Sequence, residues 1–206
     1  MDKQSVKEKL RNKIIAVIRC EDAAKAKLIS KTIIECGIDV LEVTFTVKGA
    51  PQLIKELKAE NPNVVVGAGT VLTTQQAEEA LISGADFIVS PCTIEEIGAF
   101  CREKNIFCSM AAATSTEAYN SHKFGSDVVK LFPGEFISPG IIKGIKAPMP
   151  FIDMMPTGGV DNKNIKTWFE NGAFAVGVGG HLTKGIDETN LDVLRARCEA
   201  LINAAK

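Results

Sequence analysis

The chain has 206 residues, a length that fits one ordinary domain and is ample for a core that needs no disulfide or metal staples. Its 24 basic and 25 acidic residues give a formal charge of −1, so no net positive field exists to hold nucleic acid or an anionic membrane. No apolar run approaches the roughly 20 residues that cross a bilayer. We therefore expect a single globular domain, residues 1–206, whose partner is a small molecule.

The N-terminal segment MDKQSVKEKLRNK lacks the apolar stretch of a secretory signal, and we expect it to form a short helix before the first strand. Six cysteines are scattered along the chain without a C-x-x-C pair or a zinc-type spacing with histidine. They are Cys20, Cys36, Cys92, Cys101, Cys108 and Cys198. These features predict reduced thiols in a cytoplasmic protein.

Short apolar runs recur along the chain, separated by longer stretches of mixed polarity. Eight such runs begin at Ile14, Val40, Val64, Phe87, Phe107, Val128, Phe151 and Phe174. Successive starts lie 20 to 26 residues apart in the sequence, which leaves room for one helix and two short loops in each interval. Each run is therefore predicted to be a strand.

Helical patterns fill the intervals. The segments AAKAKLISKTIIECG and TTQQAEEALISG end in glycine, TIEEIGAFCREK opens on Thr93, and DNKNIKTWFENG runs from Asp161 to Gly172. Strands and helices that alternate eight times indicate a parallel sheet covered by helices, and eight such units close a (β/α)8 barrel of the TIM type. A flavodoxin-like open sheet is the alternative, but it needs fewer strands.

Strand alternation places two charged residues inside this barrel. In VLEVTFT, the apolar residues Leu41, Val43 and Phe45 share the face that should meet the helices, so Glu42 points inward. In VVKLFP the same rule directs Lys130 inward. Burial penalises the ammonium form of a lysine, and a neutral amine can attack a carbonyl. Lys130 is therefore suited to forming a Schiff base.

A structural ion pair is the alternative interpretation of Glu42 and Lys130. Both residues lie toward the strand ends that lead to the upper face, where barrel active sites gather, and Arg19 and Thr70 end their own strands there. Glycine pairs follow the seventh and eighth strands in PTGG and GVGG, where many barrels bind phosphate through backbone N–H groups. This arrangement predicts an active site with an anionic substrate.

With these residues the chain resembles the 2-keto-3-deoxy-6-phosphogluconate (KDPG) / 4-hydroxy-2-oxoglutarate (KHG) aldolase family of class I pyruvate aldolases. The similarity runs in order through KIIAVIR, LEVTFT, VVGAGTVL, GADFIVSP, VVKLFPGE, PTGGV, AVGVGG and LTKG, nearly the whole chain. The resemblance implies cleavage of KDPG to pyruvate and glyceraldehyde 3-phosphate, with KHG, which gives pyruvate and glyoxylate, as a further substrate. It also implies a homotrimer and a reaction that requires no metal or cofactor.

The resemblance assigns roles to individual residues. Lys130 corresponds to the Schiff-base nucleophile and Glu42 to the general acid and base, while Thr70 and Pro91 line the pyruvate pocket. The other expected substrate contacts are Arg19, Thr46, Gly158, Gly159, Gly180 and His181. Arg19 would meet a carboxylate and the three glycines would border the phosphate, whereas His181 either donates to the anion or simply begins the next helix.

Three positions depart from the family's pattern. Thr46 stands where many members have arginine, the segment from Met110 to Glu117 stands where a Pro-Gly pair is usual, and Gly180 replaces a phosphate-binding serine. The choice between the two substrates therefore stays open. Two rival functions also stay open: a phosphosugar isomerase or epimerase that uses Glu42 without a covalent step, and a non-catalytic anion-binding barrel.

Overall fold

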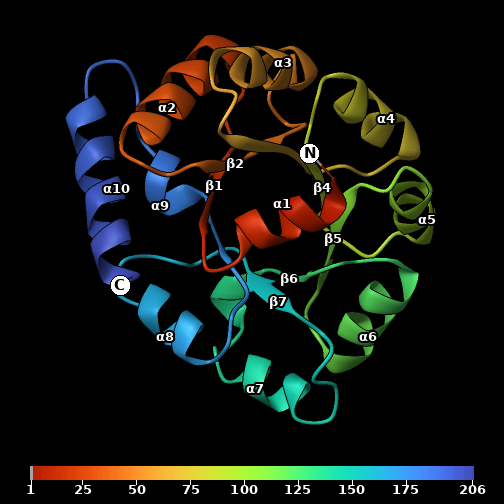
Figure 1. Ribbon diagram of the computed structural model, residues 1–206. Coiled ribbons are helices and arrows are strands. Elements are labelled where there is room, and N and C mark those ends of the chain that lie inside the picture. Colours follow the sequence, from red (N-terminus) through yellow and green to blue (C-terminus); the bar gives the residue numbers. More distant parts are fainter. Residues whose placement is uncertain (1) are drawn as a thin grey trace.

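The computed structural model describes residues 2–206 as a parallel barrel surrounded by helices (Figure 1). The strands are β1 (Ile14–Ile18), β2 (Val40–Thr44), β3 (Val65–Gly69), β4 (Phe87–Ser90), β5 (Phe107–Ala112), β6 (Val129–Leu131), β7 (Met154–Pro156) and β8 (Val176–Val178). The helices are α1 (Lys3–Leu10), α2 (Ala23–Glu35), α3 (Ala50–Glu60), α4 (Thr74–Ile82), α5 (Glu95–Glu103), α6 (Ser115–Phe124), the 3-10 helix η1 (Gly134–Phe136), α7 (Ile141–Lys146), α8 (Ile165–Glu170), α9 (Gly180–Thr183) and α10 (Leu191–Ala204). None of these helices is long and apolar enough to cross a membrane.

The eight strands form a ring that closes between β7 and β8. Each strand from β1 to β7 pairs in parallel with its neighbour in the chain, and β1 also pairs with β8. A parallel bridge between Thr157 and Gly177 joins the ends of β7 and β8. The predicted (β/α)8 fold is confirmed, and the open-sheet alternative is wrong.

The strand residues alternate between two separate apolar cores. Leu41, Val43 and Leu131 belong to the outer core between strands and helices, as the sequence pattern predicts. An inner core fills the amino half of the barrel. It includes Phe87 and Phe107, whose rings pack edge to face with centroids 6.3 Å apart. The inner core supports the residues that occupy the carboxyl half.

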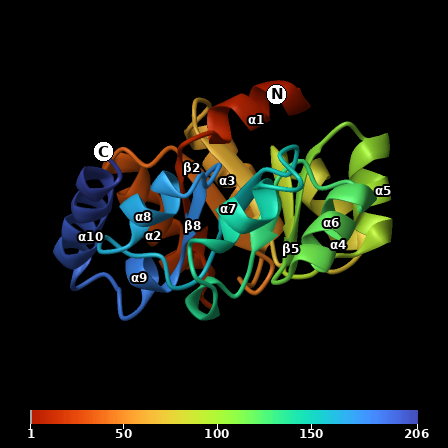
Figure 2. The ribbon, with the colours of Figure 1, turned by 90° about the horizontal axis from the view of Figure 1, so that it is seen from below.

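Helix α1 closes the amino end of the barrel. It lies across the barrel end in Figure 1 and above the strands in the side view of Figure 2. Val6 and Leu10 are completely buried in the inner core. Burial of each side chain stabilises the folded state by about 1.5–3 kcal/mol. Lys3 forms an ion pair with Asp127, at 2.9 Å from Nζ to Oδ1, and Lys7 pairs with a second aspartate. The short N-terminal helix predicted from the sequence is therefore a plug.

Several predicted boundaries differ from the structure: β3 and β6 start one residue after the predicted Val64 and Val128, and β8 starts at Val176, two residues after Phe174. The seventh apolar run starts at Phe151, but β7 starts at Met154, because Phe151 still lies in the preceding turn with 57% of its surface exposed. Thr93 does not cap α5, since its hydroxyl donates to the Ala111 carbonyl at 2.9 Å, and the helix begins at Glu95.

Candidate active site

Lys130 and Glu42 meet inside the barrel above the inner core. They come from β6 and β2, with Lys130 Nζ 3.3 Å from Glu42 Oε1, and their side chains are 4% and 1% exposed. The second carboxylate oxygen, Oε2, has no hydrogen-bond partner in the protein, and the Lys130 amine also lies 5.3 Å from the centre of the Phe132 ring. An amine and a carboxylate at hydrogen-bond distance, shielded from water, can exchange a proton.

The small size of Gly69 makes room for the Glu42 carboxylate. A Cβ atom at position 69 would lie 2.6 Å from Glu42 Cγ and 2.7 Å from Cδ, well inside ordinary carbon contact distance. Gly67, one step earlier on the same face of β3, makes room for the Phe87 ring in the same way. The glycines of VVGAGT thus allow large side chains to cross the barrel interior.

By strand alternation Ser109 and Thr157 also face the barrel interior, and Ser109 Oγ and Thr157 Oγ1 are buried without a partner in the protein. Buried polar atoms are nearly always hydrogen-bonded, so such atoms at one place indicate where a ligand or water binds. Ser109 lies two residues after the inner-core residue Phe107 on β5, and Thr157 directly follows β7. Neither was predicted as a site residue from the sequence.

Thr46 is placed by a chain of hydrogen bonds that fixes its proton. The Thr44 hydroxyl donates to the Ile18 carbonyl at 3.0 Å, and the hydroxyls of Thr44 and Thr46 are 2.6 Å apart. Because the proton of Thr44 is already used, Thr46 must be the donor in the second bond. Thr46 is an exposed residue, and in this arrangement its hydroxyl offers lone pairs but cannot also donate to a substrate carboxylate.

Thr70 has an unusual backbone conformation. Its φ of +57° lies in the left-handed region, which is costly for a β-branched residue, at roughly 1–3 kcal/mol. Among residues 2–206, Asn12 and Asn105 also have positive φ, and asparagine is a type that tolerates this conformation. Such strain is typical of active sites, and it occurs here at the residue that was expected to bind the keto acid.

A cavity of about 570 Å³ opens at the carboxyl ends of β1, β7 and β8. Four predicted site residues line it: Arg19, Gly158, Gly159 and Gly180. Thr157 and Phe132 also line it, together with Cys20, whose thiol pKa is raised by burial.

Phe132 also borders a second cavity, of about 340 Å³, whose lining includes Pro91, Cys92 and Glu117. The Pro91 cavity and the glycine-lined cavity thus share Phe132, the residue two positions after Lys130.

The glycine-lined cavity is bordered by two copies of one loop motif. GVDNKN (159–164) and GIDETN (185–190) share the pattern Gly-apolar-Asp-x-x-Asn. In each, the asparagine side chain donates to the glycine carbonyl, at 2.7 Å and 2.9 Å, and accepts from the aspartate N–H, at 3.1 Å and 2.9 Å. Helices α8 and α10 start directly after the two asparagines, so the predicted helix start at Asp161 is wrong.

The loop glycines have left-handed φ values of +67° for Gly159 and +74° for Gly185. Within the described residues, their N–H groups donate no hydrogen bond to the protein, and neither do those of Gly158 and Gly179. Free backbone donors that surround a cavity are suited to an anion. The repeated pattern is visible in the sequence, but its meaning depends on the hydrogen bonds that the folded loops reveal.

The remaining predicted residues lie farther from this cavity. His181 is the second residue of α9, its Nε2 is buried without a partner, and it is not among the residues that line either cavity. The segment from Met110 to Glu117, which stands where the family usually has a Pro-Gly pair, begins as the last part of β5, which ends at Ala112. Thr114 and Glu117 then form a capping box that starts α6.

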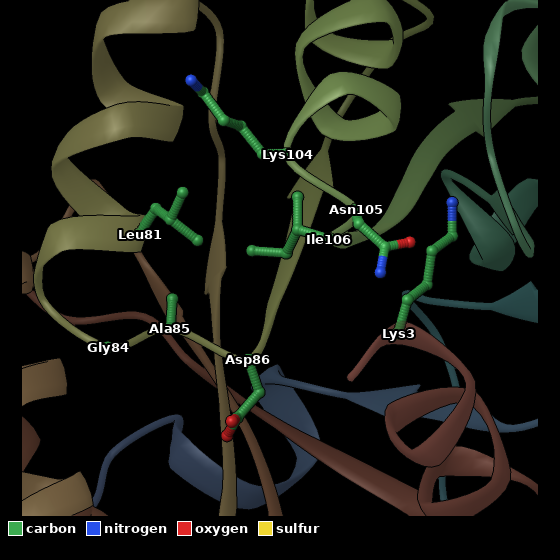
Figure 3. Close-up of a pocket in the computed structure, with 8 residues that line it drawn as sticks. All are labelled: Lys3, Leu81, Gly84, Ala85, Asp86, Lys104, Asn105 and Ile106. Atoms are coloured by element: carbon green, nitrogen blue, oxygen red, sulfur yellow. The ribbon is translucent and has the colours of Figure 1, made fainter. Parts of the chain in front are cut away.

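A smaller cavity, of about 230 Å³, lies at the opposite end of the barrel (Figure 3). Figure 3 shows the Asp86 carboxylate directed away from Lys3 and Lys104. This carboxylate pairs with Lys58 at 2.6 Å and accepts from the Val66 N–H at 2.9 Å. Its charge is therefore satisfied within the protein, and the cavity is a surface crevice between helices.

No group of three or more histidine, cysteine, aspartate or glutamate side chains among residues 2–206 is arranged to hold a metal ion. The expectation of a reaction without metal or cofactor stays a prediction, because it depends on the chemistry at Lys130.

Known proteins resemble this chain in both sequence and structure. The family model "KDPG and KHG aldolase" matches residues 6–196. A 2-dehydro-3-deoxy-phosphogluconate aldolase of Haemophilus influenzae is 34% identical over 168 residues, 80% of this chain and 79% of that protein.

Two solved structures share the fold. The 2-keto-3-deoxy-6-phospho-gluconate aldolase of Zymomonas mobilis has a TM-score of 0.85 and 28% identity, covering 98% of this chain and 96% of its own. The KDPG aldolase of Legionella pneumophila, captured with pyruvate as a covalent carbinolamine, has a TM-score of 0.84 and 25% identity, covering 93% and 94%. On this evidence the chain belongs to the KDPG and KHG aldolase family.

Proposed function

We propose that the protein is a class I aldolase that cleaves KDPG to pyruvate and glyceraldehyde 3-phosphate, and also cleaves KHG to pyruvate and glyoxylate. The observation that carries this proposal is the buried contact of 3.3 Å between Lys130 Nζ and Glu42 Oε1. The family membership and the names of the similar aldolases support the same activity.

The reaction begins with nucleophilic attack. Glu42 takes a proton from Lys130, and the neutral amine attacks the C2 ketone to form a carbinolamine, in which C2 carries both nitrogen and oxygen. Glu42 returns its proton to the C2 hydroxyl group, which leaves as water, so that a protonated imine forms and the carboxylate is ionised again. A carbinolamine formed with pyruvate is the species described for the Legionella pneumophila aldolase, which supports this first step.

Carbon–carbon cleavage follows from the charge of the imine. Glu42, directly or through one water, removes the proton of the C4 hydroxyl, the C3–C4 bond breaks, and its electron pair moves into the imine to give an enamine. The C4 fragment leaves as an aldehyde. Glu42 then returns a proton to C3, and hydrolysis of the imine releases pyruvate and regenerates Lys130.

The two cavities next to Phe132 divide the substrate between them. We assign the keto-acid end to the cavity that Pro91 lines, and the far end to the glycine-lined cavity with Arg19. Thr70 lines neither cavity, and its contact with the keto acid stays a prediction. Binding at the far end holds the reacting bond over the amine, which lowers the entropy that must be lost in the transition state. Thr46, whose proton is held by Thr44, would accept rather than donate hydrogen bonds in this scheme.

Borohydride reduction in the presence of pyruvate tests the proposal. The protein should gain one pyruvyl group on Lys130, located by peptide mass spectrometry, while Lys130→Met should gain none and lose turnover. Lys166→Met is the matched control, because Lys166 is an exposed helix residue outside both cavities, and it should behave like the wild type.

Other outcomes identify the rival functions. Turnover of a phosphosugar without an adduct on Lys130 would indicate an isomerase or epimerase. Undiminished ligand binding by Lys130→Met, with no turnover in either protein, would indicate a binding barrel.

We further propose that residues 1–206 form one domain, and that the protein is a cytoplasmic homotrimer. A solved protein cage that was designed by fusing symmetric oligomeric domains supports an oligomer, since its chain shares this fold with a TM-score of 0.85. A single cooperative unfolding transition, light scattering at three times the chain mass, and recovery in the cytosolic fraction are the expected results.

A further inference from the structure

Three cationic side chains line the glycine-lined cavity: Arg19, Lys25 and Lys184. Glu135 is the one carboxylate residue in the same lining. Within the described part of the chain, none of the three cations forms an ion pair with a carboxylate, whereas nine other lysines do. The cavity thus has a positive charge that the protein leaves uncompensated.

Separate elements bring the two lysines to the cavity. Lys25 lies in the first turn of α2, where its N–H donates to Asp22 Oδ1 at 2.7 Å, and Lys184 is the C-cap of α9. Arg197 of α10 donates to the carbonyls of Leu182 and Lys184, at 3.1 Å and 2.9 Å, which fixes the backbone that carries Lys184. The lysine side chains therefore extend from a firmly held backbone.

A further carboxylate, Asp187, lies near Lys25 but does not neutralise it through an ion pair. Asp187 has its pKa lowered by hydrogen bonds from Thr189 and, less strongly, by the positive charge of Lys25, so this carboxylate is close to Lys25 without forming an ion pair. Counting only the residues of the lining, three positive charges oppose the single negative charge of Glu135.

We infer that Lys25 and Lys184 are specificity-determining residues of this chain, which form a clamp for a phosphate ester at the far end of the substrate, so that KDPG is cleaved more efficiently than unphosphorylated keto acids, KHG included. A phosphate monoester carries a charge of about −1.5 to −2 near neutral pH. It therefore balances the net positive charge of the lining better than a single carboxylate would. Gly180 has no side chain to donate to the phosphate, and the lysines supply charged donors in its place. This inference rests on the proposed function, because it concerns the far end of the same substrate.

The test compares Lys25→Gln, Lys184→Gln and the double variant with the wild type, using KDPG and its unphosphorylated analogue 2-keto-3-deoxygluconate. For KDPG, each single change should lower kcat/KM about tenfold, since a hydrogen bond to a charged group contributes roughly the free energy of a tenfold change in affinity. The effect should appear mainly in KM. For the unphosphorylated analogue, kcat/KM should stay within about twofold of the wild type, so the ratio of the two values falls.

Two further measurements keep this inference separate from the proposed function. Inorganic phosphate, titrated by calorimetry, should bind the wild type and the control Lys166→Gln alike and bind the double variant at least tenfold more weakly. Borohydride trapping of pyruvate on Lys130 should be unchanged in every lysine variant. Trapping with an unchanged substrate ratio and unchanged phosphate affinity would overturn the clamp alone, whereas absence of trapping in the wild type would overturn the aldolase mechanism.

Discussion

Replacing Gly69 by alanine tests whether the position of the Glu42 carboxylate controls the reaction. The new methyl group would lie 2.6 Å from Glu42 Cγ, whereas carbon atoms in contact are normally about 3.5–4.0 Å apart, so the side chain must move by about 1 Å. Glu42 Oε1 is 3.3 Å from Lys130 Nζ, so a displacement of this size disrupts their contact. A misplacement of about 1 Å costs roughly a hundredfold in rate, and we expect kcat to fall by about that factor.

Stopped assays of pyruvate release measure kcat, and thermal unfolding checks that the barrel is intact. Gly144→Ala is the matched control, because a Cβ at that position of α7 meets nothing within 4 Å. The control should keep full activity and gain about 0.5–1 kcal/mol of stability, the usual effect of alanine in place of a helical glycine. Full activity of a folded Gly69→Ala protein would refute the idea that Glu42 acts from its present position.

Three further predictions concern stability and thiol reactivity. Leu10→Ala removes part of the α1 plug and should lower the free energy of unfolding by about 2–5 kcal/mol in urea titrations, since the residue is fully buried. Cys92 is exposed and should react first with a thiol reagent at neutral pH. Burial raises the pKa of Cys198 to about 12, so this thiol should stay unreactive until the protein unfolds. Equal rates of modification at Cys92 and Cys198 in the folded protein would contradict this prediction. Burial alone would raise the pKa of Asp153, but the ammonium groups of Lys146 and a second lysine lower it below the usual 3.8. The Asp153 carboxylate therefore stabilises the fold above pH 3.8 and loses this effect as the pH falls through its lower folded value, so Asp153→Asn should destabilise the protein at pH 7 more than at pH 3.

The sequence predicts the barrel well because its strands obey one simple rule. Buried strands of a parallel barrel are apolar on both faces, and the few polar residues that interrupt them stand out, so alternation alone directed Glu42 and Lys130 inward. The ends of elements were less predictable. Phe151 is as apolar as a strand residue, but it lies in a turn, and hydrophobicity does not distinguish the two positions.

The far end of the site could not be derived from residue types alone. Lys25 and Lys184 look like ordinary surface lysines in the sequence, and only the folded loops show that both line the cavity of Arg19. The direction of the Thr46 hydroxyl depends on a neighbour's hydrogen bond to Ile18, which no local pattern encodes. Such features arise from contacts between segments distant in the chain, beyond the reach of a local pattern.

The closure of the barrel's amino end by α1 has a consequence for the lifetime of the proposed covalent intermediate. Val6 and Leu10 fill that end, and the cavities lined by Phe132, two residues after Lys130, lie at the carboxyl mouth. In the proposed mechanism, a substrate that occupies this mouth would also obstruct the approach of water to the imine. The plug would thus favour carbon–carbon cleavage over premature hydrolysis, without touching any reacting atom.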